Sequence, residues 1–334
     1  MVDFGNIPLM ELNDFLAEWH NDNPRILVHT SGSTGKPKPL MVEKRRMLNS
    51  ARITCDFLGL KPGDTALLCM PLDYIAGKMM VVRSLQRDLR LTSVRPSSHP
   101  LADETLPHFT FAAMVPMQVY NTLKVPCERE RLMHIHHLII GGGAISDELA
   151  QMIKPLPNAV WSTYGMTETL SHIALRRLNG PDACLWYTPF DGVGISLNAD
   201  GCLVINAPEV CAEPLVTNDI AQLRTDDRTG KTLFRIKGRK DNVVCSGGIK
   251  IQIEEVEETL RPHLSAPFMI IKKQDEVLGE KAILLTESAD LTHIEEICRN
   301  TLPKYWVPRE FLHIDHLPLT ETGKPKRTLP FTPR

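Results

Sequence analysis

Four hydroxyl side chains, two glycines and two lysines lie within nine consecutive residues, 30–38. The amides, hydroxyls and ammonium groups of such a loop can wrap a polyphosphate. The residues proposed to do so are Thr30, Ser31, Gly32, Ser33, Thr34, Gly35 and Lys36. This is not a Walker loop, because only two residues separate the first glycine from the Gly-Lys pair and four are required. A solvated linker is the alternative, which the position directly after the apolar run RILVH disfavours.

The loop resembles the phosphate-binding signature of the adenylate-forming superfamily, which includes acyl-CoA ligases, amino-acid-activating domains and luciferases. Two more segments follow in that superfamily's order, GGGA at 141–144 and STYGMTET at 162–169. The resemblance extends from about residue 25 to the end of the chain. It implies an ATP-dependent enzyme that activates a carboxylic acid as an acyl-adenylate and then passes the acyl group to coenzyme A.

The resemblance assigns nucleotide-binding and catalytic roles to these segments. Glycines let an aromatic base approach the backbone closely, and a tyrosine offers the base a flat face. A glutamate is a hard oxygen ligand suited to Mg²⁺ bridging ATP phosphates, and a threonine hydroxyl can bind the α-phosphate. Taken singly, the glycines would also fit a plain turn and the glutamate a solvated surface charge. The expected nucleotide-binding residues are Gly142, Gly143, Ala144, Ser162, Tyr164, Gly165 and Met166, with Thr167 and Glu168 catalytic and Glu168 the metal ligand.

The resemblance places a ribose-binding residue and a hinge further along the chain. Asp219 matches the acidic residue that binds the ribose hydroxyls, although Asn218 stands where the family usually has glycine. The segment GRKD at 238–241 resembles the hinge between the large and small domains. Arg239 is expected near the ribose and Asp241 as the pivot, with a plain polar linker as the alternative.

Two C-terminal segments resemble the parts of the family that serve its two half-reactions. Ser246, Gly247 and Gly248 match the loop that lines the tunnel for the pantetheine arm of coenzyme A. The family's catalytic lysine maps onto Lys324, which follows glycine directly in LPLTETGKPKR. In the family this lysine serves adenylation, after which the small domain rotates and presents the thiol tunnel.

The acid pocket of the superfamily is built partly from the segment that corresponds to residues 71–83. Tyr74 stands where many relatives have a histidine. Arg83, six positions beyond Gly77, matches an arginine of the o-succinylbenzoate-CoA ligases of menaquinone biosynthesis, whose substrate carries a second carboxylate. A guanidinium suits that group, and an arginine on a helix surface is the alternative. We therefore predict o-succinylbenzoate as the acid and Tyr74, Gly77 and Arg83 as substrate-binding residues.

The elements that position these residues can be inferred from the hydrophobic pattern. Strand-like runs RILVHT, TALLCM and LRLTSV alternate with helical runs, and FTFAAMV, PMQVYNTLK and HHLII follow, which predicts βαβ units and a helix capped by Ser146. From about residue 192, short strands broken by Gly, Asn and Asp predict a β-rich subdomain. We expect an α/β fold with a large ATP- and acid-binding domain at 1–238, its β-rich subdomain at 192–238, and a mobile α+β domain at 239–334.

Composition narrows the partners and the compartment. The net charge of -2 and pI near 6.6 disfavour nucleic acid and anionic membranes as partners. No run reaches the roughly 18 apolar residues of a membrane span, and the N-terminus does not resemble a signal peptide, so we expect a cytoplasmic enzyme. The 8 cysteines form no CxxC pair, which argues against a zinc ribbon or a redox motif.

The N-terminal part is short for the superfamily. Members usually have well over a hundred residues before the phosphate loop, whereas 29 precede Thr30 here. We expect a compact form, natural or truncated, that lacks most of the N-terminal subdomain. A homo-oligomer would cover surface that the missing part would bury.

Other functions stay open on the sequence alone. Another aryl- or acyl-CoA ligase would share every nucleotide motif. An amino-acid-activating domain that loads a carrier protein would need an acidic residue for the substrate ammonium, and Asp73 keeps this option open. A non-catalytic nucleotide-binding regulator is disfavoured by the presence of Lys324.

Overall fold

The computed structural model describes residues 11–29, 39–143, 145–319 and 326–327. Internal contacts divide the chain into two compact units. The first unit comprises residues 1–195, 205–215 and 224–234, and the second comprises residues 196–204, 216–223 and 235–334. The expected domain boundary at residues 238 and 239 stays a prediction.

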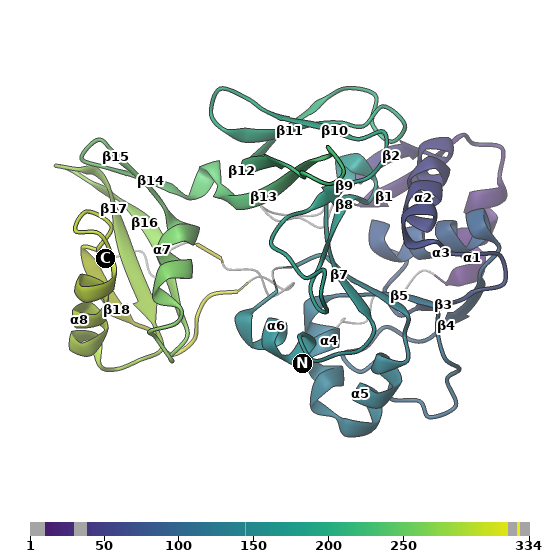
Figure 1. The fold of residues 1–334 in the computed structure, drawn as a ribbon, viewed down its shortest axis with the longest axis horizontal. Helices are drawn as coiled ribbons and strands as arrows, with labels where there is room; N and C mark the ends of the chain where they lie inside the picture. Colours follow the sequence, from purple (N-terminus) through teal and green to yellow (C-terminus); the bar gives the residue numbers. More distant parts are fainter. Residues whose placement is uncertain (1–10, 30–38, 144, 320–325, 328–334) are drawn as a thin grey trace. The chain divides into compact units, whose positions relative to one another are not determined.

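A seven-stranded sheet forms the centre of the first unit (Figure 1). Its order is β4-β3-β5-β6-β7-β8-β9. The first five strands are parallel to one another, β8 pairs antiparallel with β7, and β9 pairs antiparallel with β8. The central strands β3, β5 and β6 are almost completely buried, which explains their near-continuous apolar runs. The strands are β3 (Thr65–Leu68), β4 (Arg90–Ser93), β5 (Phe111–Met114), β6 (His137–Ile140), β7 (Ala159–Gly165), β8 (His172–Arg177) and β9 (Thr188–Pro189).

Helices cover the two faces of this sheet. Apolar side chains of α4, α5 and α6 pack on one face in a single core cluster, and Figure 1 shows α2 and α3 together on the other side. Ser146 caps α6 as predicted, because its hydroxyl accepts the Leu149 N–H at 3.2 Å. The helices are α1 (Leu12–His20), α2 (Lys44–Leu58), α3 (Ile75–Arg87), α4 (Pro116–Lys124), α5 (Pro126–Met133) and α6 (Asp147–Ile153), with the 3₁₀ turn η1 (Thr167–Thr169) after β7.

The first predicted βαβ unit is wrong. β1 (Arg25–His29) does not join the sheet of β3 but pairs antiparallel with β2 (Pro39–Glu43) in a separate two-stranded sheet. The reason is that the chain returns as β2 before α2 begins, so the partner of β1 is its neighbour in sequence. The units β3-α3-β4 and β5-α4-α5-β6 are parallel, as predicted.

The β-rich part contains a four-stranded sheet in the order β10-β11-β12-β13, whose residues are divided between the two units. Its strands are β10 (Gly194–Leu197), β11 (Cys202–Asn206), β12 (Leu215–Thr225) and β13 (Thr232–Arg239).

The C-terminal residues form a five-stranded sheet with two helices. The order is β15-β14-β17-β16, and β18 pairs parallel with β17. Side chains alternate along β16, so that Ile270 packs with α7 and α8 while Met269 and Ile271 join a second apolar cluster. The elements are η2 (Lys240–Asn242), β14 (Val243–Ser246), β15 (Ile249–Gln252), α7 (Ile253–Leu260), β16 (Phe268–Asp275), β17 (Gly279–Thr286), α8 (Leu291–Thr301) and β18 (Glu310–His313).

The predicted α/β class, with parallel sheets and an α+β C-terminal part, is therefore confirmed. Among the described residues, no helix is long and apolar enough to cross a lipid bilayer.

Candidate active site

Two of the predicted nucleotide motifs lie next to each other at the carboxyl ends of β6 and β7, which pair in parallel. Gly142 and Gly143 follow β6, and Gly142 has φ of 79°, where glycine is favoured. Gly141 is needed for another reason, because a Cβ there would overlap the side chain of Thr163 on β7. The carboxyl edge of a parallel sheet is where open α/β folds bind ligands.

An aromatic cluster surrounds the predicted adenine-facing tyrosine. The Tyr164 ring lies edge-on to Phe234, with centroids 5.0 Å apart, and 5.7 Å from the Tyr187 ring. Tyr187 in turn stacks on Phe234 at 5.3 Å. The buried Ser162 shares a 2.9 Å hydrogen bond with the Tyr187 hydroxyl. Ser162 therefore supports this cluster; Tyr187 and Phe234 were not identified from the sequence.

The segment after β7 folds back on itself. The Thr169 hydroxyl oxygen accepts the Met166 N–H at 3.0 Å, and the same hydroxyl reaches the Ser171 carbonyl oxygen at 2.7 Å. Thr167 is buried and Glu168 is exposed. The predicted metal ligand is thus accessible, and its neighbours are fixed by a local hydrogen-bonded turn.

Gly165 makes this turn possible. A Cβ at Gly165 would overlap backbone atoms of Ser171 and His172, where β7 and β8 change register. We expect Gly165→Ala to lower the free energy of unfolding by about 1–3 kcal/mol, because only a backbone shift relieves the overlap. Urea denaturation measures this, with Gly194→Ala as control, since the nearest atom to a Cβ at Gly194 lies 3.7 Å away. Equal small effects of both substitutions would contradict this account.

Arg83 lies in the interior, on α3, with 2% of its surface exposed. Its Nη2 donates to the Ser171 hydroxyl at 2.6 Å, its Nη1 lies 3.9 Å from the Met80 Sδ, and its Nε has no partner. Burial lowers the pKa of Arg83 to about 10, which leaves the guanidinium charged at neutral pH. The alternative of a helix-surface arginine is therefore wrong.

The other predicted acid-pocket residues lie at the start of α3. Tyr74 precedes the first turn and is exposed, whereas Gly77 is buried against the Pro71 carbonyl, which a Cβ would overlap. The next residue, Lys78, is buried and donates to the Leu27 carbonyl of β1 at 2.8 Å. Burial lowers the pKa of Lys78. Lys78, which the sequence did not identify, thus ties α3 to β1, the strand that precedes the predicted phosphate loop.

The second unit brings together the predicted ribose and hinge residues. Arg239 places Nη1 3.7 Å from Asp219 and Nη2 3.1 Å from Asp241. Asn218 donates to Asp241 at 3.4 Å and does not adopt positive φ, so the glycine usual in the family is not needed here. Two acidic side chains and one arginine therefore form a partly exposed polar cluster.

The predicted tunnel loop is a tight hairpin turn. Ser246 pairs with Ile249 across β14 and β15, which leaves Gly247 and Gly248 as a two-residue loop. Their φ values of 57° and 82° are those of a type I′ turn, which glycine favours at both positions.

Several predicted residues lie outside the described part of the chain. They are the phosphate-loop residues Thr30, Ser31, Gly32, Ser33, Thr34, Gly35 and Lys36, together with Ala144 and Lys324.

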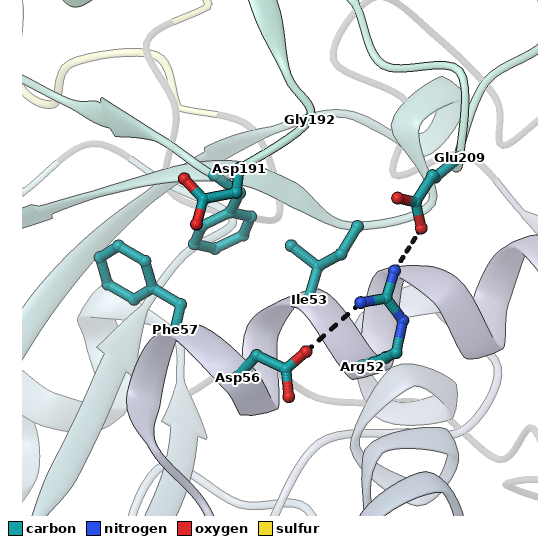
Figure 2. A pocket seen from close by; sticks show the side chains of 8 residues that line it. Arg52, Ile53, Asp56, Phe57, Asp191, Gly192 and Glu209 are labelled. Atoms are coloured by element: carbon teal, nitrogen blue, oxygen red, sulfur yellow. Dashed lines mark hydrogen bonds and ion pairs between the residues drawn. The ribbon is translucent and has the colours of Figure 1, made fainter. Parts of the chain in front are cut away.

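A pocket of about 340 Å³ opens at a different place, between α2 and residues 190–192 (Figure 2). Arg52 on its rim pairs with Asp56 and Glu209, and Lys231 pairs with Asp191 at 2.7 Å. The charged side chains of this rim, among the residues that the structure describes, are therefore paired with one another or with Lys231.

Comparison with known proteins identifies the family. Residues 9–205 match the family model described as AMP-binding enzyme, and the chain therefore belongs to that family. It is an enzyme of the AMP-forming acid–thiol ligase class. A solved acyl-CoA synthetase (AMP-forming)/AMP-acid ligase II-like protein from Dyadobacter fermentans is 33% identical, with 94% of this chain and 91% of that one covered and a TM-score of 0.66.

Curated relatives point to a narrower group. The 2-succinylbenzoate–CoA ligase of Bacillus mycoides is 25% identical over 92% of this chain and 69% of its own length. The Salmonella typhimurium enzyme of the same name is 28% identical over 89% and 66%. The chain thus spans about two thirds of the length of these relatives. O-succinylbenzoate coenzyme A synthetase from Bacillus subtilis, solved with ATP and magnesium ion, shares the fold at 22% identity and a TM-score of 0.70, with 90% of this chain and 68% of that one covered.

Proposed function

We propose that this protein is an ATP-dependent acid-CoA ligase whose acid is o-succinylbenzoate. Family membership and the curated relatives named 2-succinylbenzoate–CoA ligase support the reaction class. The observation that carries the choice of acid is the buried charge of Arg83.

The surroundings of Arg83 lack the usual counterion. In the described part of the chain, no carboxylate pairs with its guanidinium, and its Nε has no partner at all. A buried, unpaired charge costs several kcal/mol relative to water, so a folded protein normally provides an anion for it. o-Succinylbenzoate has two carboxylates, of which one is activated. The other is then available to compensate Arg83.

The proposed reaction has two half-reactions. A carboxylate oxygen of the acid attacks the α-phosphate of ATP and expels pyrophosphate, and the thiol of coenzyme A then attacks the acyl carbonyl and releases AMP. We assign Thr167 and Lys324 to stabilising the charge at the α-phosphate and the loop at 30–36 to the departing phosphates. Gly142, Gly143 and Tyr164 would border the adenine, Asp219 and Arg239 the ribose, and residues 246–248 the pantetheine arm.

Glu168 fits the role of magnesium ligand. Mg²⁺ in nucleotide sites usually takes one or two carboxylates from the protein and fills its other positions with phosphates and water. Glu168 is an exposed carboxylate next to a buried threonine, and no group of three His, Cys, Asp or Glu side chains suited to a metal occurs among the described residues. When bound, the ion would neutralise negative charge on the phosphates.

Acid-dependent exchange of pyrophosphate into ATP tests the proposal. Exchange with o-succinylbenzoate, followed by CoA thioester formation, is the expected result. No exchange with any acid would mean a nucleotide-binding regulator. Exchange with amino acids and no transfer to CoA would mean a carrier-loading domain, and exchange with monocarboxylic aryl acids alone would retain the ligase but remove the proposed substrate.

A further inference from the structure

A continuous chain of hydrogen bonds links Arg83 to α2, and the proposed function assigns a role to none of its members except Arg83. Arg83 Nη2 donates to the Ser171 hydroxyl at 2.6 Å, and that hydroxyl lies 3.2 Å from His172 Nδ1. His172 Nε2 lies 3.1 Å from the Thr54 hydroxyl, which donates to the Ser50 carbonyl at 3.1 Å. We call these four side chains, Arg83, Ser171, His172 and Thr54, the Arg83 hydrogen-bond chain.

Each hydrogen in this chain can be assigned from its partners. The only hydroxyl hydrogen of Thr54 is used on the Ser50 carbonyl, so its oxygen accepts from His172 Nε2–H. Burial, and then the charge of Arg83, lower the pKa of His172 well below its usual value, which makes the ring neutral and leaves Nδ1 without a hydrogen. Ser171 therefore donates to Nδ1, and its lone pair is directed at Arg83.

The chain holds one edge of the Arg83 guanidinium without neutralising its charge. Every partner is a neutral dipole, whereas a carboxylate at position 171 would have cancelled the charge. The Nη2 end of the guanidinium is held in place by Ser171, whereas its Nε has no partner. The positive charge therefore remains available to bind an anionic group.

We propose that the Arg83 hydrogen-bond chain positions the guanidinium for the second anionic group of the acid, and so selects dicarboxylic over monocarboxylic aryl acids. Ser171, His172 and Thr54 are then positioning residues, which act on the substrate only through Arg83. The inference rests on the proposed function, since it deepens the assignment of the acid.

Ser171→Ala in this 334-residue chain tests the inference. Loss of a hydrogen bond to a charged group should raise KM for o-succinylbenzoate on the order of 10-fold, with KM for ATP unchanged. A monocarboxylic aryl acid should be affected less than about 2-fold, because it does not need the oriented charge. Ser171→Thr keeps the hydroxyl and should restore most of the preference. If Ser171→Ala weakens both acids equally, the positioning role is wrong.

Thr54→Val provides a second test if Ser171→Ala folds poorly. Valine has the shape of threonine, and position 54 is three hydrogen bonds away from Arg83, so a loss of preference for the dicarboxylic acid on the order of 3-fold is expected. An unchanged preference would contradict the inference.

Nitrogen NMR of His172, assigned by comparison with His172→Gln, gives a readout that needs no activity. We expect a neutral ring with the hydrogen on Nε2, and a ring with the hydrogen on Nδ1 would overturn the assigned chain.

A wild-type enzyme that does not prefer the dicarboxylic acid would instead refute the proposed substrate. A preference that survives Ser171→Ala and Thr54→Val would refute only the positioning role.

Discussion

Lys324→Ala is expected to slow formation of the acyl-adenylate by about 10²–10³-fold, because it would remove the charge that we assign to the α-phosphate, where negative charge develops. The second half-reaction attacks a carbonyl and leaves this phosphorus untouched. The variant should therefore still convert synthetic acyl-adenylate and CoA to the thioester at close to the wild-type rate. Pyrophosphate exchange measures the first step, and thioester formation from the synthetic adenylate measures the second.

Gly247→Asn is the reciprocal control. Asparagine tolerates the positive φ of 57° at this position, so the hairpin turn should persist while a side chain enters the proposed pantetheine path. Adenylation should be spared and thioester formation slowed.

If Lys324→Ala weakens both half-reactions to the same extent, the lysine is a general scaffold residue and the division between the two steps is wrong.

The described residues next to Lys324 are firmly held. Arg327 makes two hydrogen bonds to the Glu257 carboxylate of α7, at 2.6 and 2.9 Å, and donates to the Ile270 carbonyl of β16 at 2.6 Å. The Lys326 N–H donates to the Pro318 carbonyl at 2.8 Å. Lys326 and Arg327 are thus attached to described residues of the second unit.

Much of the fold could be predicted because local signals agreed with the tertiary arrangement. The continuous apolar runs of β3, β5 and β6 indicate strands buried on both faces, and Ser146 marks the start of α6. β1 was misassigned because strand pairing is a tertiary property. An apolar run predicts a strand but does not state whether its partner is a parallel neighbour or the next strand in sequence.

The candidate site was predictable where chemistry depends on a contiguous motif, and not where it depends on contacts across the fold. The sequence indicates Gly165 and Arg83 through motif and spacing, but not the contacts that each residue makes. A Cβ at Gly165 would overlap backbone atoms of Ser171 and His172, and Arg83 is buried, which excludes only the alternative of a helix-surface arginine. Thr54 is 118 residues from His172, and no periodicity or motif connects the two.

Arg83→Leu is expected to weaken binding of o-succinylbenzoate about 10- to 150-fold, because charge-assisted contacts of this kind are worth about 1.5–3 kcal/mol. The proposed nucleotide contacts are made by other segments, so affinity for ATP should hardly change. A monocarboxylic aryl acid lacks the second charge and should lose far less. Steady-state kinetics with both acids on the wild type and the variant provide the measurement.

The stability of the unliganded variant separates a ligand role from a scaffold role. If Arg83 is kept for an anion that the free protein lacks, replacing its buried, unpaired charge with leucine should leave the free energy of unfolding unchanged or raise it. If Arg83 instead holds α3 to the Ser171 region, the same substitution should destabilise the protein by about 1–3 kcal/mol and weaken both acids alike. Urea denaturation of the wild type and the variant, each with and without o-succinylbenzoate, distinguishes the two roles. If Arg83 binds the acid, o-succinylbenzoate should stabilise the wild type more than Arg83→Leu.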